Sequence, residues 1–530
     1  MRATRLDAAL ARRHTEDGAW AGNLVDGYLA AAATATPDAV AVVDRERSWS
    51  YGDLDGAVNR LASALRARGV GPGEVVSWML PNRVEALIVH HAAIRLGTVS
   101  NPIIPIYRHH ETRFILRQAR SAVMVVPDEF RGFDYPQMVA DIRDDLPELR
   151  TVVVVGASGP AADMAFEDLL DEGRPDPVPT PGRDADDIVL LLYTSGTTSS
   201  PKGALHSHNT LDHENRSIIE LYGLSGADVV FMPSPVGHII GVLYGMQLPA
   251  MLGIPVVLLD VWEPGRALQL IAAHRCSFTV AATPFLAGLV RHPSLDEIDV
   301  SALRVFACGG ADVPPDLVRS ATDALGCTVS RGYGSTEYPT ATGSNTTDDL
   351  VKRSRTDGRP IGRTEIRLET DGELLVRGPE MFLGYLDPAL NDDAFTADGW
   401  FRTGDLARTD ADGYVEITGR KKDIIIRGGE NISAKEIEDQ LFEHPAVADV
   451  AVVATPDAVL GERVCAVVVP TPGRAVTLDD LVAWLTARRI ARQKLPERLV
   501  LLDDLPRNAS GKVQKFRLRD LVASSQPVPS

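Results

Sequence analysis

The sequence predicts an α/β fold, with a large N-terminal domain of stacked mixed or parallel sheets and a small α+β domain at the C-terminal end. Short apolar runs alternate with helical patterns over most of the chain, and this alternation indicates parallel sheets covered by helices. After about residue 362 the pattern changes to short alternating segments with Asp-Gly turns, which indicate antiparallel hairpins.

The strands expected in the large domain are continuous apolar runs at residues 75–80, 123–126, 151–155, 188–192, 229–232, 255–259 and 304–307. A clear helix is expected from Asp53 to about Arg68, because Leu residues recur on one face and Gly69 provides a stop. The Pro-, Gly- and Asp-rich segment 173–187 is expected to connect two lobes.

The hairpins are expected at residues 365–369, 373–377 and 413–418. Ser433 and Glu436 then form a capping box that predicts the start of a helix. Strands at 449–454 and 464–469 and a second helix entered at Thr477 complete a unit of about a hundred residues, a plausible separate domain.

Residues 236–259 contain no Asp, Glu, Lys or Arg, which raises the question of whether they form a helix that spans a membrane. His238, Gln247, Pro249 and Pro255 interrupt it, so the favoured interpretation is a buried helix followed by a buried strand. A helix that spans a membrane is the alternative.

The composition is that of an ordinary globular protein, with 45% hydrophobic and 24% charged residues among 530. A net charge of −18 argues against nucleic acid as the main partner. Four scattered cysteines without CxxC spacing predict neither a disulfide framework nor a zinc site. The N-terminus lacks the apolar core of a secretory signal, so a cytoplasmic location is expected.

The most informative segment is LLYTSGTTSSPKG, residues 191–203, which joins an apolar strand to a hydroxyl-rich turn. Its backbone N–H groups and hydroxyls are neutral donors for anionic oxygens, and Lys202 adds a positive charge. The pattern is not a Walker loop, since Pro201 and Gly203 flank the lysine. A phosphate-binding loop is therefore predicted, with donors from Thr194, Ser195, Gly196, Thr197, Thr198, Ser199 and Ser200. A plain polar loop would account for only two or three of these residues.

Two further segments carry residues suited to a nucleotide. In RGYGSTE, residues 331–337, the ring of Tyr333 could stack on a base, and the carboxylate of Glu337 could hold Mg²⁺. A turn with a salt-bridged glutamate is the alternative. In GWFRTGDLA, Asp405 could accept both hydroxyls of a ribose, and an Asx turn is the alternative.

Two more segments are weaker on their own. Gly310 and Ala311 follow the apolar run VFAC, where bare backbone could approach a ligand edge. Lys512 lies in PRNASGK near the C-terminus, where an ordinary surface lysine is the alternative.

Taken in order, TSGTTSSPKG, GYGSTE, FRTGD, GRKKD, RGGENI and PRNASGK resemble the signature motifs of the adenylate-forming superfamily, which includes acyl-CoA synthetases, luciferases and the adenylation domains of peptide synthetases. The resemblance covers nearly the whole chain. It implies an N-terminal domain over residues 1–421 that includes a small β-barrel-like subdomain, and a C-terminal domain over 422–530 that rotates about a hinge. It also implies a carboxylic acid:CoA ligase that uses ATP, Mg²⁺ and coenzyme A through an acyl-adenylate.

The resemblance assigns roles to residues of this chain. The loop from Thr194 to Lys202 would hold the β- and γ-phosphates, although Ser199 stands where many members have Gly. Tyr333 and Gly334 would flank adenine, Thr336 and Glu337 would serve the phosphates and Mg²⁺ together with Thr194, and Asp405 with Arg420 would bind the ribose. Lys422 would be the hinge and Lys512 the catalytic lysine. Gly428 and Gly429 would line the entry for the pantetheine thiol, and His238 would gate the acid pocket unless it is a simple core histidine.

The acid itself is suggested by the segments at 101–119, 128–135 and 195–211, which look most like synthetases for cyclohexanecarboxylate and related bulky alicyclic acids. Gly237, Gly241 and Gly245 recur every four residues, which either widens the pocket or allows close packing against a neighbour. A medium-chain fatty acid, an acyl-AMP ligase that loads a carrier protein, and a non-catalytic nucleotide-binding regulator are the alternatives. A homodimer is also compatible with the sequence.

Overall fold

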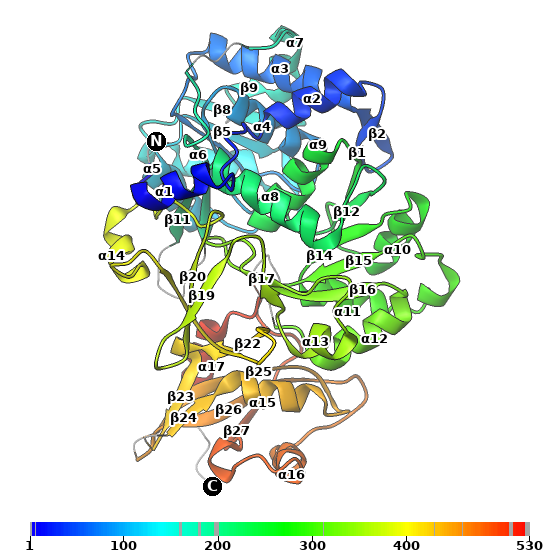
Figure 1. Ribbon diagram of the computed structural model, residues 1–530, viewed down its shortest axis with the longest axis vertical. Coiled ribbons are helices and arrows are strands. Elements are labelled where there is room, and N and C mark those ends of the chain that lie inside the picture. The colour runs from blue at the N-terminus through cyan, green and yellow to red at the C-terminus, as the bar shows by residue number, and fades with distance from the viewer. Residues whose placement is uncertain are drawn as a thin grey trace.

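The computed structural model describes residues 3–5, 7–157, 162–178, 182–194, 201–310, 312–428, 430–457, 459–507 and 512–524. Figure 1 shows two helix-covered sheets in its upper part, a four-stranded sheet at the middle left, and a smaller unit in orange below them. The predicted class is confirmed: a large N-terminal α/β domain with mixed sheets precedes a smaller C-terminal domain.

The first sheet has seven strands in the order β11-β10-β4-β3-β5-β8-β9, and all pairs are parallel except β10 with β11. Successive residues of β5 face opposite sides: Val123 and Val125 belong to the core shared with the second sheet, whereas Met124 and Val126 face α5 and α6. Both faces of the sheet are therefore buried, as a parallel sheet requires. The strands are β3 (Val75–Trp78), β4 (Val99–Pro102), β5 (Val123–Pro127), β8 (Thr151–Val155), β9 (Met164–Ala165), β10 (Ile188–Thr194) and β11 (Lys202–Ser207).

The second sheet has nine strands in the order β18-β17-β16-β15-β14-β12-β13-β1-β2 and is parallel from β1 to β16. Its outer face packs against α10 (Pro264–Ala273), α11 (Thr283–Val290) and α12 (Pro315–Leu325). The strands are β1 (Val40–Asp44), β2 (Arg47–Ser50), β12 (Val230–Met232), β13 (Val256–Leu258), β14 (Phe278–Ala281), β15 (Val305–Cys308), β16 (Thr328–Tyr333), β17 (Thr342–Gly343) and β18 (Arg359–Pro360).

Helices lie between and around these two sheets. They include α2 (Gly27–Ala35), α3 (Tyr51–Ala67), α4 (Val84–Arg95), α5 (His109–Ala119), α6 (Tyr135–Ile142), α7 (Phe166–Glu172) and α8 (His208–Tyr222). The helix predicted from Asp53 begins at Tyr51, because Ser50 caps it and Asp53 completes the capping box.

The stretch tested for a membrane span is a buried helix and strand, as predicted. Residues 241–247 form a π-helical segment (Gly241–Gln247) that continues into α9 (Leu248–Leu252), and β13 follows. None of the helices in the described part of the chain combines the length and the apolar character needed to cross a membrane.

The predicted hairpins form the four-stranded antiparallel sheet β19-β20-β21-β22, which comprises β19 (Glu365–Leu368), β20 (Glu373–Arg377), β21 (Phe401–Thr409) and β22 (Val415–Arg420). The sequence patterns did not reveal β21. Its burial alternates poorly because the register shifts against β20 between Arg402 and Leu406 and against β22 between Leu406 and Ala407.

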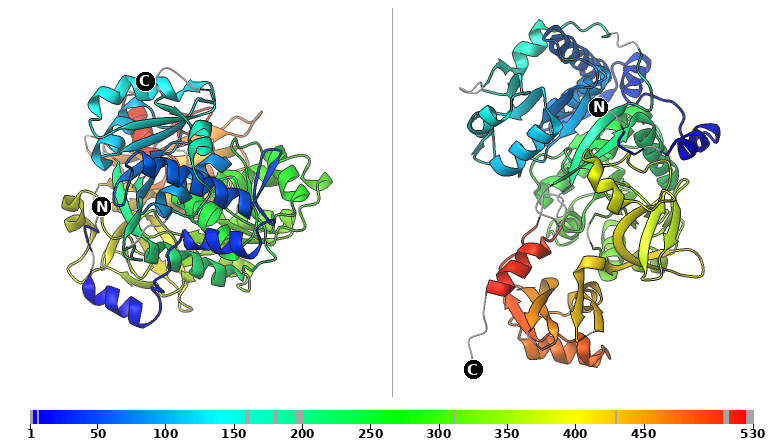
Figure 2. Two further views of the ribbon diagram at one scale, coloured as in Figure 1. Left: turned by 90° about the horizontal axis from the view of Figure 1, so that it is seen from above. Right: turned by 90° about the vertical axis from the view of Figure 1, so that its left-hand side faces the viewer.

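The smaller unit is built on β23 (Ile424–Arg427), β24 (Glu430–Ser433), β25 (Val447–Asp457), β26 (Gly461–Pro470) and β27 (Arg498–Leu501), with α15 (Ala434–Phe442), α16 (Leu478–Ala487) and α17 (Lys515–Ser524). The right-hand view of Figure 2 shows α17, in red, between the upper sheets and the orange strands. Ser433 caps α15 as predicted, but Glu436 does not close the box, because its carboxylate pairs with Lys494 at 2.7 Å.

Candidate active site

A cavity of about 610 Å³ opens at the carboxyl ends of β10, β15 and β16, where the four-stranded sheet and the C-terminal unit meet the large sheets. Ligands of open parallel sheets bind at this edge. Most of the described residues predicted for the site line this one cavity: Thr194, Lys202, His238, Gly310, Tyr333, Gly334, Thr336, Glu337, Asp405, Arg420, Lys422 and Lys512. The predicted residues Ser195, Gly196, Thr197, Thr198, Ala311 and Gly429 lie outside the described residues.

The two ends of the predicted phosphate loop are held together by the sheet. Thr194, the last residue of β10, is the antiparallel partner of Lys202, the first residue of β11. The ammonium of Lys202 lies 5.2 Å from the ring centroid of Tyr385. The hydroxyl of Tyr385 in turn donates a 2.7 Å hydrogen bond to Oε1 of Glu337. Tyr385 therefore positions both a cation and a carboxylate at this end of the cavity.

A second contact joins β11 to the segment that follows β16. Nε2 of the buried His206 donates to the carbonyl of Thr336 at 2.8 Å. Burial lowers the pKa of His206 to about 4, so its ring is neutral at pH 7. Neither His206 nor Tyr385 was anticipated, since nothing in their local sequence indicates a partner 130 residues away for His206 or 48 residues away for Tyr385.

Among the described residues, Glu337 has no salt-bridge partner, so the alternative of a salt-bridged glutamate in a turn is not supported. In the described part of the chain its side-chain hydrogen bond comes from the Tyr385 hydroxyl, and the residue is 9% exposed. Mg²⁺ is commonly held by one or two carboxylates plus substrate phosphates rather than by an all-protein cage. A buried carboxylate that lines the same cavity as the Thr194 hydroxyl fits that mode of binding.

The predicted ribose residue lies in a defined polar cluster. Oδ2 of Asp405 accepts a hydrogen bond from the Tyr333 hydroxyl at 2.6 Å, and Oδ1 pairs with Nε of Arg420 at 2.7 Å. Asp405 and Arg420 are direct partners across β21 and β22. Burial and the Asp405 carboxylate raise the pKa of Tyr333, so its hydroxyl keeps its proton. The carboxylate is thus bound by side chains, and the Asx-turn alternative is not what the structure has.

Three basic side chains converge on the cavity from the chain around residue 422 and from the C-terminal unit. Burial and the nearby Arg420 lower the pKa of Lys512 to about 7. The same two causes lower the pKa of Lys422 to about 8. A lysine with a pKa this low in a cleft is typical of a functional group rather than of an ordinary surface lysine.

His238 lines the cavity and is half-buried, which favours the pocket role over a core role. Burial, assisted by the charge of Lys512, lowers its pKa to about 4. The neutral imidazole and Lys512 therefore share one region of the site.

The inner end of the cavity is lined by Ile218, Tyr222, Tyr244, Val280, Ala307 and Cys308. The Tyr222 hydroxyl lies 3.2 Å from Oγ of Ser330, and the Tyr244 hydroxyl lies 2.8 Å from Oγ1 of Thr340. Both hydroxyls are thus engaged with the protein. Burial raises the pKa of the Cys308 thiol to about 12.

The three repeated glycines allow close packing and do not widen the pocket. A Cβ on Gly241 would lie 2.3 Å from the carbonyl oxygen of Pro235, and one on Gly245 would lie 2.8 Å from Cγ of Met232. Gly237 precedes the helix, and the helix is π-helical from Gly241, so a four-residue spacing does not define one face. None of the three lines the cavity.

Gly428 was expected at the site, and the structure places it elsewhere. It forms the turn between β23 and β24, where its N–H donates to the carbonyl of Leu460 at 2.7 Å. The edge of the C-terminal unit that carries Lys512 faces the cavity, and Gly428 does not line it.

Comparison with known proteins agrees with this geometry. Residues 29–386 match the family described as AMP-binding enzyme, and residues 436–512 match the AMP-binding enzyme C-terminal domain. A medium-chain fatty-acid–CoA ligase of Escherichia coli is 36% identical over 96% of this chain and 92% of its own length. A salicylyl-CoA synthase / salicylate adenylyltransferase of a Streptomyces species is 35% identical over 97% of this chain and 96% of its own. The crystal structure of ATP-bound MatB from Rhodopseudomonas palustris superposes with a TM-score of 0.85 at 28% identity and covers 94% of this chain and 99% of that one.

Proposed function

We infer that this chain, which belongs to the family of AMP-binding enzymes, is an AMP-forming acyl-CoA synthetase that uses ATP, Mg²⁺ and coenzyme A. In the first half-reaction a carboxylate oxygen attacks the α-phosphorus of ATP, and pyrophosphate leaves. In the second, the thiol of coenzyme A attacks the acyl carbon, loses its proton, and AMP leaves.

The observation that carries this proposal is the convergence of Lys202, Arg420 and Lys512 on one cavity with the carboxylates of Glu337 and Asp405. The first half-reaction brings two anions together, so its transition state needs preorganised positive charge. Lys512 supplies it from the C-terminal unit and Lys202 from the base of the phosphate loop.

The polar clusters suggest where each part of the nucleotide binds. We place the ribose at Asp405, whose carboxylate oxygens accept from Tyr333 and Arg420 and have further lone pairs that can accept from ribose hydroxyls. The adenine lies along Tyr333 and Gly334, and the phosphates lie between Thr194 and Thr336. Glu337, with Thr194, would hold Mg²⁺, which would neutralise charge on the phosphate oxygens.

The acid is proposed to be compact and ring-shaped, of the bulky alicyclic or natural-product type. The cavity of about 610 Å³ must hold the nucleotide as well as the acid, and its inner end is walled by Tyr222 and Tyr244. Limited space beside aromatic walls favours a rigid ring over a long chain. A medium-chain fatty acid is the second candidate, favoured by the aliphatic side chains of Ile218 and Val280.

The division into residues 1–421 and 422–530, with Lys422 as the hinge, accounts for the position of Gly428. Lys422 lies in a short 3-10 turn (Lys421–Asp423) between β22 and β23, which is the connection between the two parts. Rotation there would withdraw Lys512 after the adenylate forms and bring the turn at Gly428 to the cavity for the thiol step.

The test is pyrophosphate release from ATP and Mg²⁺ across a panel of alicyclic, aromatic and fatty acids, with coenzyme A, with a phosphopantetheinylated carrier protein, or with neither. We expect release with one acid class, a CoA thioester as product, and loss of release in Lys512→Ala. Thioester formation on the carrier protein alone would instead identify an acyl-AMP ligase. Absence of release with every acid, despite binding of ATP, would support a nucleotide-binding regulator.

A further inference from the structure

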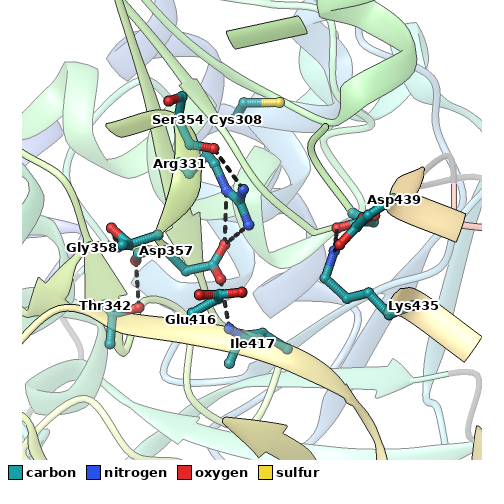
Figure 3. Close-up of polar contacts among 12 residues, drawn as sticks. Cys308, Arg331, Thr342, Ser354, Asp357, Gly358, Glu416, Ile417, Lys435 and Asp439 are labelled. Atoms are coloured by element: carbon teal, nitrogen blue, oxygen red, sulfur yellow. Dashed lines mark hydrogen bonds and ion pairs between the residues drawn. The ribbon is translucent and has the colours of Figure 1, made fainter. Parts of the chain in front are cut away.

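A cluster of one lysine and two aspartates lies where the large domain meets the C-terminal unit. Nζ of Lys435, in the first turn of α15, contacts Oδ1 of Asp312 and lies 2.9 and 3.1 Å from the two carboxylate oxygens of Asp439. Lys435 and Asp439 are one turn apart on the same helix, whereas Asp312 follows β15, 123 residues earlier. Figure 3 shows the Lys435 side chain extended toward Asp439, with the Arg331–Asp357 pair in the same view.

The Lys435–Asp312 contact joins the two parts of the molecule. Other ion pairs of the C-terminal unit lie within it, such as Arg427 with Glu497, Lys494 with Glu436, and Lys515 with Glu438. Those pairs can move as a body with the unit. The pair with Asp312 cannot, because its partner belongs to the large domain.

Asp312 is well placed to fix an orientation. It lies two residues after Gly310, which lines the nucleotide cavity, and its own carbonyl accepts a 2.6 Å hydrogen bond from Oγ1 of Thr283. The start of α15 has a second attachment, since Oγ of its N-cap residue, Ser433, donates to the carbonyl of Thr418 on β22 at 2.7 Å. Two points on one helical turn therefore set how the C-terminal unit sits on the large domain.

The Lys435–Asp312 contact lines the same cavity as Lys512, the lysine proposed to act in adenylation. Asp312, Lys435 and Asp439 line a second cavity of about 1060 Å³ between the two parts, and Lys512 lines both this cavity and the nucleotide cavity. When the contact at Lys435 fixes the orientation of the C-terminal unit, Lys512 therefore reaches the nucleotide site.

The opposite charges stabilise the Lys435–Asp312 contact and still allow the two side chains to separate. Lys435 is 15% exposed. Burial alone would raise the pKa of Asp312, yet the Lys435 ammonium holds it below its usual range. Burial and the Asp312 carboxylate raise the pKa of Asp439. Both ions of such a pair regain water when they part, and that hydration offsets much of the lost attraction.

We propose that Asp312 and Lys435 are positioning residues for the adenylation step: their ion pair holds the C-terminal unit in the orientation that delivers Lys512, and it separates before the thiol step. This inference rests on the proposed function and deepens it. Asp439→Asn serves as the matched control, because it changes the same cluster but leaves the Asp312–Lys435 ion pair in place. The new amide keeps an oxygen for Lys435 and offers an N–H donor to the Asp312 carboxylate, which Asp439 also contacts.

The two half-reactions are measured separately in Asp312→Asn, Lys435→Met, Lys435→Arg and Asp439→Asn. Adenylation is followed by ATP–pyrophosphate exchange, and the second step by thioester formation from preformed acyl-adenylate and coenzyme A. We expect about a tenfold loss of adenylation in Asp312→Asn and Lys435→Met, with the thiol step unchanged or faster. Lys435→Arg should recover most of the loss, and Asp439→Asn should resemble the parent. Equal losses in both steps, or the same loss in Asp439→Asn, would overturn the proposal.

A second measurement does not depend on catalysis. Fluorescent labels at Asp323→Cys on α12 and Asp479→Cys on α16 report the distance between the two parts, and the four native cysteines are buried. In the presence of ATP we expect Asp312→Asn to broaden or shift the distance distribution, and Asp439→Asn to leave it unchanged. An unaltered distribution in Asp312→Asn would refute the positioning role, even if no acid proves to be a substrate.

Discussion

The hydroxyl of Tyr333 donates a 2.6 Å hydrogen bond to Oδ2 of Asp405, although the two residues are 72 positions apart. The bond ties the end of β16, in the second large sheet, to β21 of the four-stranded sheet. The two sides of the proposed nucleoside site are therefore linked before any nucleotide binds, which reduces the ordering required on binding.

Removal of that hydroxyl should weaken ATP binding. In Tyr333→Phe, Oδ2 of the buried Asp405 loses a donor, and a charge-assisted hydrogen bond contributes about 1.5–3 kcal/mol. We expect KM for ATP to rise about tenfold or more, with a smaller change in kcat. Tyr414→Phe is the control, because it removes a Tyr–Asp hydrogen bond of the same length, to Asp348, from residues that do not line the nucleotide cavity. Equal KM values in the two variants would contradict this role for Tyr333.

The rate should depend on pH through Lys512. Its pKa of about 7 means that the ammonium is present below pH 7 and is lost above it. Because kcat/KM reports groups of the free enzyme, kcat/KM for ATP should fall as pH rises through 7. The profile of kcat should stay level to higher pH, since bound phosphates favour the charged form.

Lys512→Arg tests this assignment, because a guanidinium stays charged throughout the range. Any activity that remains in this variant should lack the decline near pH 7. A decline that persists unchanged would show that another group titrates.

Glu337→Gln should change the requirement for Mg²⁺. The amide removes a negative charge from a residue proposed to hold the ion, while Tyr385 can still donate to its carbonyl oxygen. We expect the Mg²⁺ concentration for half-maximal pyrophosphate release to rise about tenfold or more. Glu369→Gln is the control, as Glu369 pairs with Arg367 outside the cavity. An unchanged Mg²⁺ titration in Glu337→Gln would remove Glu337 from the metal site.

Gly245→Ala should affect stability but not the choice of acid. Its new Cβ would meet Cγ of Met232 at 2.8 Å, and overpacking of this kind costs about 1–3 kcal/mol. Thermal unfolding should therefore occur at a lower temperature, with the ranking of acids unaltered. Gly226→Ala, where a Cβ would meet nothing within 4 Å, should leave the unfolding temperature nearly unchanged. An altered acid preference in Gly245→Ala would revive the pocket-widening interpretation.

Much of the fold could be predicted because its signals are local. The apolar runs at β5, β8 and β10 and the leucine spacing of α3 depend on neighbouring residues alone. The sequence of residues 191–203 likewise predicts phosphate binding from its own hydroxyl-bearing residues and Lys202.

The contacts that organise the site are not local and were missed for that reason. His206 binds the carbonyl of Thr336, and Tyr385 binds Glu337, through pairings that only the folded chain defines. The glycine spacing left close packing and pocket widening both open, because the sequence does not show that the helix widens to a π-helix from Gly241. Gly428 was predicted from the RGGENI segment, and a sequence motif does not specify which edge of the C-terminal unit faces the cavity.

Cys308 has a further chemical consequence. Its sulfur lies beside a cavity in which an activated acyl group would form, and a thiolate there would be acylated in place of coenzyme A. Its pKa of about 12 keeps that side chain protonated and a poor nucleophile at neutral pH. Burial of the thiol thus protects the protein from self-modification by its own intermediate.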